Sequence, residues 1–94
     1  MTIKQKINSE KFRAILKSNK VKKIAIFGSY AQGKAGLHSD MDFLVEFNND
    51  ADLFDQIGLK HDLQDFLKKD VDVVTKASLS KYIRNSVLKG AIDL

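Results

Sequence analysis

Three segments of the chain have the apolar pattern of β-strands. Residues 21–27 are rich in Val and Ile and are followed by a glycine, and residues 71–75 contain three valines. In residues 41–47, Met, Phe and Val occupy every second position. Short runs of this kind, bounded by turn-forming residues, are typical of strands that are buried on at least one face. The pattern therefore predicts three strands.

Helical periodicity occupies the stretches between these strands. Ser9 is a candidate N-cap for a helix over residues 9–18, whose apolar side chains recur three and four positions apart. A longer helix is predicted over residues 52–68. A last helix starts at residue 78 or 80 and ends near residue 89, before Gly90. The chain contains no proline, so these ends are inferred from caps and glycines.

The connections complete a regular alternation of helices and strands. Residues 28–34 are interpreted as a turn followed by a short helix, residues 35–40 as a loop and residues 48–50 as a turn. The resulting order, α-β-α-β-α-β-α, predicts a small mixed α/β domain (of the α+β type) with a three- or four-stranded sheet flanked by helices. No repeat or linker interrupts the sequence, so residues 1–94 are expected to form a single domain.

Composition and charge narrow the class of protein. The 94 residues are 44% hydrophobic and 30% charged, which fits a folded globular domain, and the absence of cysteine excludes disulfides and thiolate metal sites. No segment resembles a signal peptide or a membrane span, so a cytoplasmic protein is expected. The formal net charge of +4 first suggests nucleic-acid binding. However, residues 1–38 carry +8, residues 39–72 carry −7 and residues 73–94 carry +3. An acidic centre thus lies between basic flanks.

A glycine-serine pair follows the first predicted strand directly. Gly28 allows a ligand to approach the backbone, and the unpaired amides at the start of a helix bind phosphate. The hydroxyl of Ser29 would add one more donor. An ordinary strand-turn-helix junction has the same sequence pattern, so on this pair alone both interpretations remain open.

The acidic centre contains three aspartates that can face one another. Asp40 and Asp42 are two positions apart where the second strand starts, so both side chains would point to one face, roughly 6–7 Å apart at Cα. Asp72 lies between two valines and joins them if the third strand pairs beside the second. Such carboxylates repel each other without a cation, and oxygen ligands favour Mg²⁺ or Mn²⁺ over zinc. The alternative is exposed acids at a strand end, as is expected for Asp70.

These residues together resemble a known family. Residues 28–45 contain G-S-Y-A-Q-G, five residues, and then S-D-M-D-F-L-V. This resembles the nucleotidyltransferase signature of the DNA polymerase beta superfamily, G-S-x-A-x-G, five residues, S-D-x-D-x-x-V, with every fixed position filled. The segment V-D-V-V around Asp72 is similar to the strand that carries the third acid of that family. The length and element order resemble the stand-alone minimal nucleotidyltransferases (MNT proteins), which implies the nucleotidyltransferase fold over nearly the whole chain.

The resemblance implies a role for each matching residue. Gly28 and Ser29 would hold the β- and γ-phosphates of ATP. Asp40 and Asp42 would bind Mg²⁺, and Asp72 would complete a two-metal site and help to activate the attacking hydroxyl. The expected reaction transfers AMP to a hydroxyl of a partner protein and releases pyrophosphate. Because MNT proteins commonly pair with HEPN-domain toxins, the acceptor is expected to be a toxin tyrosine and the chain to be an antitoxin.

One departure from the family concerns the turn. Members often carry arginine at both variable positions of G-S-x-A-x-G, whereas this chain has Tyr30 and Gln32. Two charges that would face the phosphates are therefore absent, and Lys34 would compensate in part as a point charge. The alternative function is a catalytically weak or inactive antitoxin that neutralises its partner by binding alone.

Several remaining features have an ordinary structural explanation beside a functional one. His38 is either a substrate contact or a solvated loop residue, and His61 is expected to be structural. The lysines at 4, 6, 11, 17, 20, 22 and 23 form either a solvated basic face or an attraction for an acidic partner or triphosphate. Direct nucleic-acid binding is not expected, because an acidic triad repels phosphate when no metal is bound.

The helix over residues 52–68 is apolar on more than one side. It is expected either to be covered by two neighbouring elements or to offer a surface to a partner protein. One broad stripe is predicted to contain Leu53, Phe54, Ile57, Leu63 and Leu67, with Leu59 and Phe66 projecting elsewhere.

Overall fold

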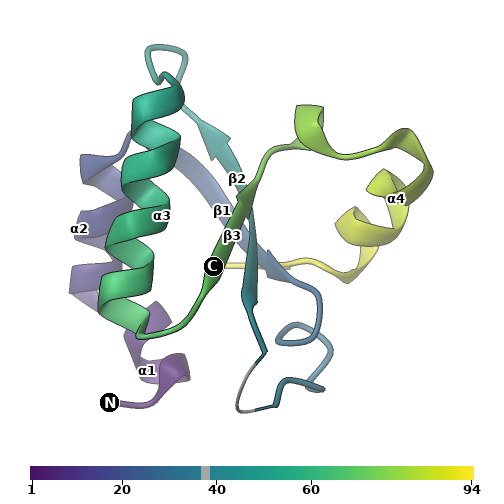
Figure 1. Ribbon diagram of the computed structural model, residues 1–94, viewed down its shortest axis with the longest axis horizontal. Helices are drawn as coiled ribbons and strands as arrows, with labels where there is room; N and C mark the ends of the chain where they lie inside the picture. The colour runs from purple at the N-terminus through teal and green to yellow at the C-terminus, as the bar shows by residue number, and fades with distance from the viewer. Residues whose placement is uncertain (37–38) are drawn as a thin grey trace.

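A mixed four-stranded sheet forms the centre of the computed structural model, which describes residues 1–36 and 39–94 (Figure 1). The strand order is β3-β2-β1-β4. β1 (Val21–Phe27) runs antiparallel to β2 (Met41–Phe47) and to β4 (Ile92–Asp93), whereas β2 and β3 (Val71–Val74) are parallel. The three predicted strands and the mixed α/β architecture are confirmed. The two-residue strand β4 was not predicted, and β3 ends one residue earlier than expected.

The helices begin at short polar side chains that cap them. Ser9 caps α2 as predicted and accepts a hydrogen bond from the Phe12 amide at 3.3 Å, while Asp52 caps α3. Ser80, the second of the two candidates, caps the last helix. The helices are α1 (Ile3–Ile7), which was not predicted, α2 (Glu10–Ser18), α3 (Leu53–Leu67) and α4 (Lys81–Gly90), with a 3₁₀ turn, η1, at Lys76–Ser78.

The short helix expected within residues 28–34 is wrong, because this segment forms turns. Gly28 and Gly33 both have positive φ, at 73° and 70°, which a right-handed helix does not accommodate. The Gln32 amide donates to the Gly28 carbonyl at 3.1 Å, and the Lys34 amide donates to the Ser29 carbonyl at 2.9 Å. The segment therefore folds back tightly without a helical run.

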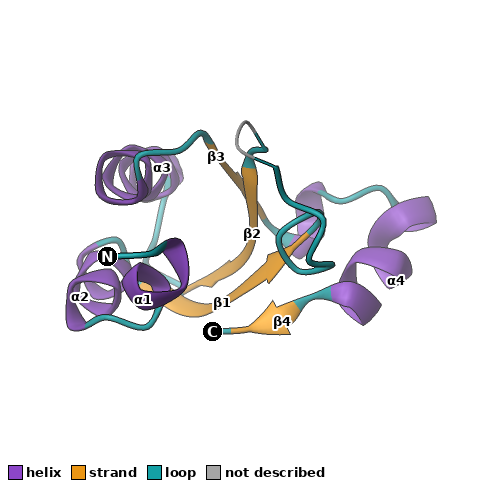
Figure 2. Ribbon diagram, turned by 90° about the horizontal axis from the view of Figure 1, so that it is seen from below, coloured by secondary structure: helices purple, strands orange, loops and turns teal. Residues whose placement is uncertain are grey.

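The two faces of the sheet are covered by different helices (Figure 2). Helices α1, α2 and α3 lie on one side, and α4 lies on the other. Alternate residues of β2 divide between these sides, because successive side chains of a strand point to opposite faces. The main core, on the side of α2 and α3, contains Phe12, Ile24, Ile26, Met41, Phe43, Val45, Leu59, Leu63, Leu67 and Val71. A smaller cluster on the other side contains Ala25, Leu44 and Leu79.

Helix α3 contributes a different apolar face to the core from the one predicted. Leu59, Leu63 and Leu67 are almost fully buried, at no more than 1% exposure. Leu59, which was predicted to project elsewhere, therefore shares the buried stripe with Leu63 and Leu67, and Ile57 lies roughly 200° around the helix from it. The residues left exposed are Leu53, Phe54 and Ile57, at 68%, 82% and 46%. The predicted stripe is therefore wrong, and these three form an exposed apolar patch.

A glycine inside α3 is explained by a buried asparagine. Asn19, 7% exposed, follows α2 and donates from Nδ2 to the Ile15 carbonyl at 2.8 Å and to the Asp62 carboxylate at 2.9 Å. A Cβ placed on Gly58 would lie 2.8 Å from Asn19 Oδ1. The helix thus accepts a residue of poor helix propensity because α2 and α3 pack closely at this point. Among the described residues, no helix is long and apolar enough to cross a membrane.

Replacing this glycine should lower stability. A Gly→Ala change inside a helix normally stabilises it by about 1 kcal/mol. Because the new methyl group would displace Asn19, we expect Gly58→Ala to lower the free energy of unfolding by about 1–3 kcal/mol. Urea unfolding measures the change, with Gly90→Ala as the control, since a Cβ on Gly90 would have no atom of the described residues within 4 Å. Stabilisation by both substitutions would contradict the proposed packing constraint.

Candidate active site

Asp42 and Asp72 lie opposite each other on the sheet face away from α2 and α3. The parallel register of β2 and β3 pairs Asp42 with Asp72 and Met41 with Val71. Because Met41 and Val71 are buried against the helices, at 0% and 2% exposure, the aspartates that follow them point to the opposite face. The predicted meeting of these two acids across neighbouring strands is therefore found. Asp40 is exposed and lies just before β2 begins.

The electrostatics of this group reflect its shared negative charge. The pKa of Asp42 is raised above its ordinary value, first by burial and then by the charge of Asp72 and the charge of Asp40. A hydrogen bond between the Asp42 and Asp72 side chains raises it further. Asp72 and Asp40 thus act on the same carboxyl. The arrangement favours either a proton or a cation at Asp42.

The turn after β1 lies directly against Asp42. Phe27, the last residue of β1, pairs with Asp42 in the antiparallel register. A Cβ on Gly28 would lie only 2.5 Å from Asp42 Oδ2, and Gly28 also has a φ of 73°. Glycine is therefore required at this position for two reasons: the positive φ, and the lack of space for a Cβ beside Asp42. Ser29 follows immediately and is partly exposed.

The donor set fits a hard divalent cation that also binds phosphate. Within residues 1–36 and 39–94, no three Asp, Glu or His side chains are arranged to hold a metal ion by themselves. Mg²⁺ typically uses one or two carboxylates and completes its shell with water and substrate phosphates. The Asp42–Asp72 pair, with Asp40 nearby and the Gly28 backbone against Asp42, provides that kind of partial site. We therefore expect a bound nucleotide to supply the remaining ligands.

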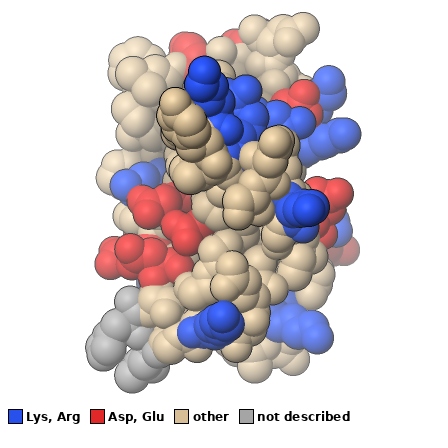
Figure 3. Space-filling model, turned by 90° about the vertical axis from the view of Figure 1, so that its right-hand side faces the viewer, with Lys and Arg blue, Asp and Glu red and all other residues tan. Residues whose placement is uncertain are grey.

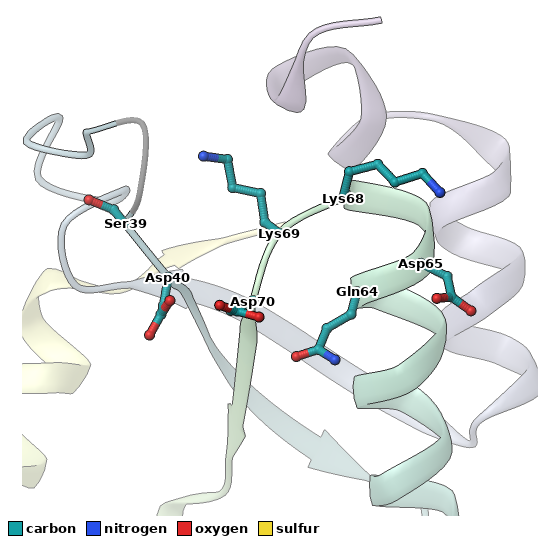
Figure 4. A pocket seen from close by; sticks show the side chains of 7 residues that line it. All are labelled: Ser39, Asp40, Gln64, Asp65, Lys68, Lys69 and Asp70. Carbon is teal, nitrogen blue, oxygen red and sulfur yellow. The ribbon is translucent and has the colours of Figure 1, made fainter.

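Two hollows adjoin the acids. One, of about 310 Å³, lies at the β3 edge of the sheet, where Asp42 and Asp72 meet Leu53, Gln56, Ile57 and Lys60 of α3, together with Val73 and Val74. The other, of about 470 Å³, lies where β2 and β3 begin and is lined by Ser39, Asp40, Gln64, Asp65, Lys68, Lys69 and Asp70 (Figure 4). Asp70 is exposed, as expected. In the second hollow, Lys69 lies with its Nζ 5.8 Å from the centroid of the Tyr30 ring, a contact that was not predicted from the sequence.

The remaining candidate residues are Lys34, His38 and His61. Lys34 is exposed at the end of the turn, and its role in nucleotide binding remains a prediction. His38 lies outside the described residues, and His61 is exposed on α3 rather than packed in the core. On the face that carries α4, several Asp and Glu side chains form a cluster, and other acidic side chains lie elsewhere on the same face among Lys and Arg (Figure 3).

Several lysines of the basic N-terminal segment make contacts with other residues of the fold. Lys6 and Lys11 each lie 5.8 Å from the centroid of the Phe66 ring. Lys20 forms ion pairs of 3.7 Å with Asp50 and Asp55. These lysines therefore contribute to packing and surface charge balance as well as to net charge.

Comparison with known proteins shows which family and which solved structures this chain is similar to. Residues 9–94 match the family model described as nucleotidyltransferase domain. A Methanocaldococcus jannaschii protein, named as a candidate protein adenylyltransferase, is 40% identical over 80 residues, which cover 85% of this chain and 86% of that protein. A solved structure described as a candidate minimal nucleotidyltransferase is 30% identical, has a TM-score of 0.83 and covers 100% of this chain and 97% of its own.

Two further solved structures are complexes. A toxin-antitoxin with AMP-PNP is 30% identical, with a TM-score of 0.72, over 88% of this chain and 68% of that one. The other is a tri-AMPylated Shewanella oneidensis HEPN toxin in complex with an MNT antitoxin. The matching chain of that complex is 26% identical to this chain, with a TM-score of 0.69, and the match covers 98% of this chain and 71% of the matching chain. The likeness therefore extends over most of both chains in each case.

The two glycines of the turn should respond differently to alanine. Gly33 has positive φ, but a Cβ on it would have no atom of the described residues within 4 Å, whereas a Cβ on Gly28 would meet the Asp42 carboxylate. We expect Gly33→Ala to cost about 1–2 kcal/mol of stability from the left-handed conformation alone. Gly28→Ala should cost more, because Asp42 must also move. Urea unfolding of both variants tests this, and equal losses would contradict the close approach at Gly28.

The charge conflict at Asp42 should appear as a pH-dependent stability difference. Since the folded-state pKa of Asp42 is raised, its favourable contribution is present below the unfolded-state pKa of about 3.9 and is lost as pH rises through the folded-state value. Asp42→Asn cannot ionise, so it should raise the Tm at pH 7 by a few degrees, with the gain shrinking below about pH 4.

Thermal unfolding in the presence of EDTA measures this difference without a bound metal. Glu46→Gln is the matched control, because Glu46 is an exposed acid on the same strand. Its carboxylate forms an ion pair of 4.0 Å with Lys22. Its substitution should change the Tm little at either pH. An Asp42→Asn variant less stable than the native chain at pH 7 would contradict the electrostatic account.

Proposed function

This chain belongs to the nucleotidyltransferase-domain family and is a nucleotidyltransferase, and from that premise we propose that it transfers AMP from ATP, with Mg²⁺, to a tyrosine hydroxyl of a HEPN-domain toxin. It would thereby act as the antitoxin of that toxin. The observation that carries the proposal is the pairing of Asp42 with Asp72, with the Gly28 turn directly against Asp42. The adenylyltransferase name of a relative and the AMPylated toxin bound to another support AMP as the transferred group and a protein as the acceptor.

The proposed roles follow from the position of each group. No helix starts directly after Gly28, so Gly28 and Ser29 would bind the β- and γ-phosphates through backbone N–H groups of the turn and through the serine hydroxyl. Asp40, Asp42 and Asp72 would hold Mg²⁺, which neutralises phosphate charge and polarises the reacting phosphoryl group when bound. Lys34, exposed at the end of the turn, would add a phosphate contact as a point charge. The acids and the turn thus orient the triphosphate for in-line attack.

The transfer step balances without a further reactant. The acceptor hydroxyl oxygen forms a bond to the α-phosphorus of ATP, and the bond from that phosphorus to the bridging oxygen of the β-phosphate breaks. Pyrophosphate leaves, and the hydroxyl proton passes toward the carboxylate of Asp72. Asp72 suits this task because it is exposed and lies on β3, one of the two edge strands of the sheet.

The surroundings of the acids also favour a protein acceptor. The hollow beside Asp42 and Asp72 is bordered by Leu53 and Ile57, two of the three exposed apolar residues of α3. An exposed apolar patch of this kind is typical of a surface that contacts another protein. An acceptor residue that enters the hollow would bring its own protein over this patch. The cytoplasmic location expected from the sequence is compatible with such a partner and remains a prediction.

A second function, neutralisation by binding alone, remains the alternative. The observation that favours it is the turn, where Tyr30 and Gln32 occupy positions that often carry arginine in the family. Loss of these charges would weaken the grip on a triphosphate. The acid group and the glycine that covers it are nevertheless present, and a chain that only binds its partner has no evident need for that costly charge cluster.

Transfer of label from ATP to the toxin tests the proposal. The chain is incubated with a HEPN-domain toxin, Mg²⁺ and ATP labelled on the α-phosphate, and the label on the toxin is counted. Asp40→Ala/Asp42→Ala should reduce labelling at least about 100-fold, since metal-bound charge stabilisation is worth several kcal/mol. Glu46→Ala on the same strand should label the toxin as the native chain does.

The outcomes separate the two functions. No label on an active, correctly paired toxin would contradict the transferase proposal. Suppression of toxicity by Asp40→Ala/Asp42→Ala, without label, would show that binding alone is sufficient. Mapping the modified residue by mass spectrometry identifies the acceptor, and a site other than tyrosine would contradict that part of the proposal.

A further inference from the structure

A lysine from another element lies beside the phosphate-binding turn. Lys69, just before β3, places its Nζ 5.8 Å from the centroid of the Tyr30 ring, and Tyr30 follows Ser29 directly in the turn. Lys69 also lines the 470 Å³ hollow together with Ser39 and Asp40. The fold thus brings one positive charge to the turn from a segment about forty positions later in the sequence.

The direction of this side chain depends on the end of α3. Lys68, the C-cap of α3, has a left-handed φ of 58°, which redirects the chain as it leaves the helix. Figure 4 shows the consequence, because Lys69 extends toward the loop that carries Ser39 while Lys68 points to the other side. Two adjacent lysines in one hollow therefore have different surroundings, and only one of them reaches the turn.

Tyr30 holds the lysine in place through its ring. Its side chain is half-buried and packs against the main core, so the ring has a fixed position. An ammonium group within about 6 Å of an aromatic centroid is attracted to the ring face. The residue that takes the place of a turn arginine thus recruits a cation from the start of β3.

The charge balance of the site makes such a cation useful. Asp40, Asp42 and Asp72 are acidic, and a triphosphate adds further negative charge that a divalent cation neutralises only in part. The hollow itself contains Asp40, Asp65 and Asp70 on the acidic side and Lys68 and Lys69 on the basic side. Of these, Lys69 is the cation directed toward the Gly28–Gly33 turn.

We propose that Lys69 is a triphosphate-binding residue of this site and that Tyr30 is the positioning residue that orients it. This inference rests on the proposed nucleotidyl transfer and deepens it. The Lys69 ammonium donates a charge-assisted hydrogen bond to a non-bridging phosphate oxygen. A lysine at the start of β3 thereby replaces charge that the turn of this chain lacks.

Binding of AMP-PNP with Mg²⁺, measured by isothermal titration calorimetry, tests the role of Lys69. Lys69→Gln should weaken binding about tenfold, equivalent to about 1.4 kcal/mol. Lys68→Gln is the matched control and should bind within about twofold of the native chain. Lys69→Arg keeps the charge and should retain most of the affinity. The loss in Lys69→Gln should also shrink at high salt.

Two substitutions of Tyr30 test how the lysine is positioned. Tyr30→Phe keeps the ring and should keep most of the affinity, whereas Tyr30→Leu should weaken binding in the native chain but add little to Lys69→Gln. In the transfer reaction, Tyr30→Leu should raise the KM for ATP more than it lowers kcat. Additive losses in the double variant would overturn the positioning role, because they would mean that the two residues act independently.

The results also separate this inference from the proposed function. If the native chain binds AMP-PNP and labels the toxin, but Lys69→Gln binds the nucleotide equally well, the inference alone is wrong. If the native chain neither binds AMP-PNP nor transfers label, both are wrong. Circular dichroism and the Tm of each variant confirm that it is folded, and Lys69→Arg separates loss of charge from loss of structure.

Discussion

The parallel pairing of β2 with β3 is the constraint on which the rest of the site depends. Met41 and Val71 are paired and buried against the helices, so their positions cannot slip without exposing apolar surface. A shift of one residue would turn Asp72 into the core and a valine toward the acids. The hydrophobic effect on one face of the sheet therefore fixes the position of charged groups on the other. The same pairing also fixes where β3 begins, and with it Lys69.

The site retains an electrostatic conflict that the fold does not relieve. Asp42 is partly buried beside Asp72 and Asp40, which raises its pKa, and the Gly28 backbone further limits its room to move. Such a conflict destabilises the metal-free protein and is tolerated because the core beneath it, formed by β1, β2, α2 and α3, is closely packed. A divalent cation and a nucleotide would relieve it by placing positive charge between the carboxylates. Binding energy and stability are thus linked at this point.

Much of the framework could be predicted because its signals are local. The alternation in residues 41–47 and the spacing of Asp40 and Asp42 located the second strand and the acids, and Ser9 marked a helix start. Other features depend on contacts distant in sequence. The two-residue strand β4 exists only because β1 offers a free edge, and the buried face of α3 is chosen by what it packs against. Likewise, no local pattern links Lys69 to Tyr30.

The proposed contact between Lys69 and the triphosphate changes how the turn and the sheet are coupled. Arginines within the turn would move with the turn, independently of β3. A lysine at the start of β3 is instead tied to Asp72, three positions later in the same segment. Any displacement of β3 would then move the phosphate-binding cation and the third acid together. Their relative geometry would be preserved, and nucleotide binding would depend on the β2–β3 pairing as much as on the turn itself.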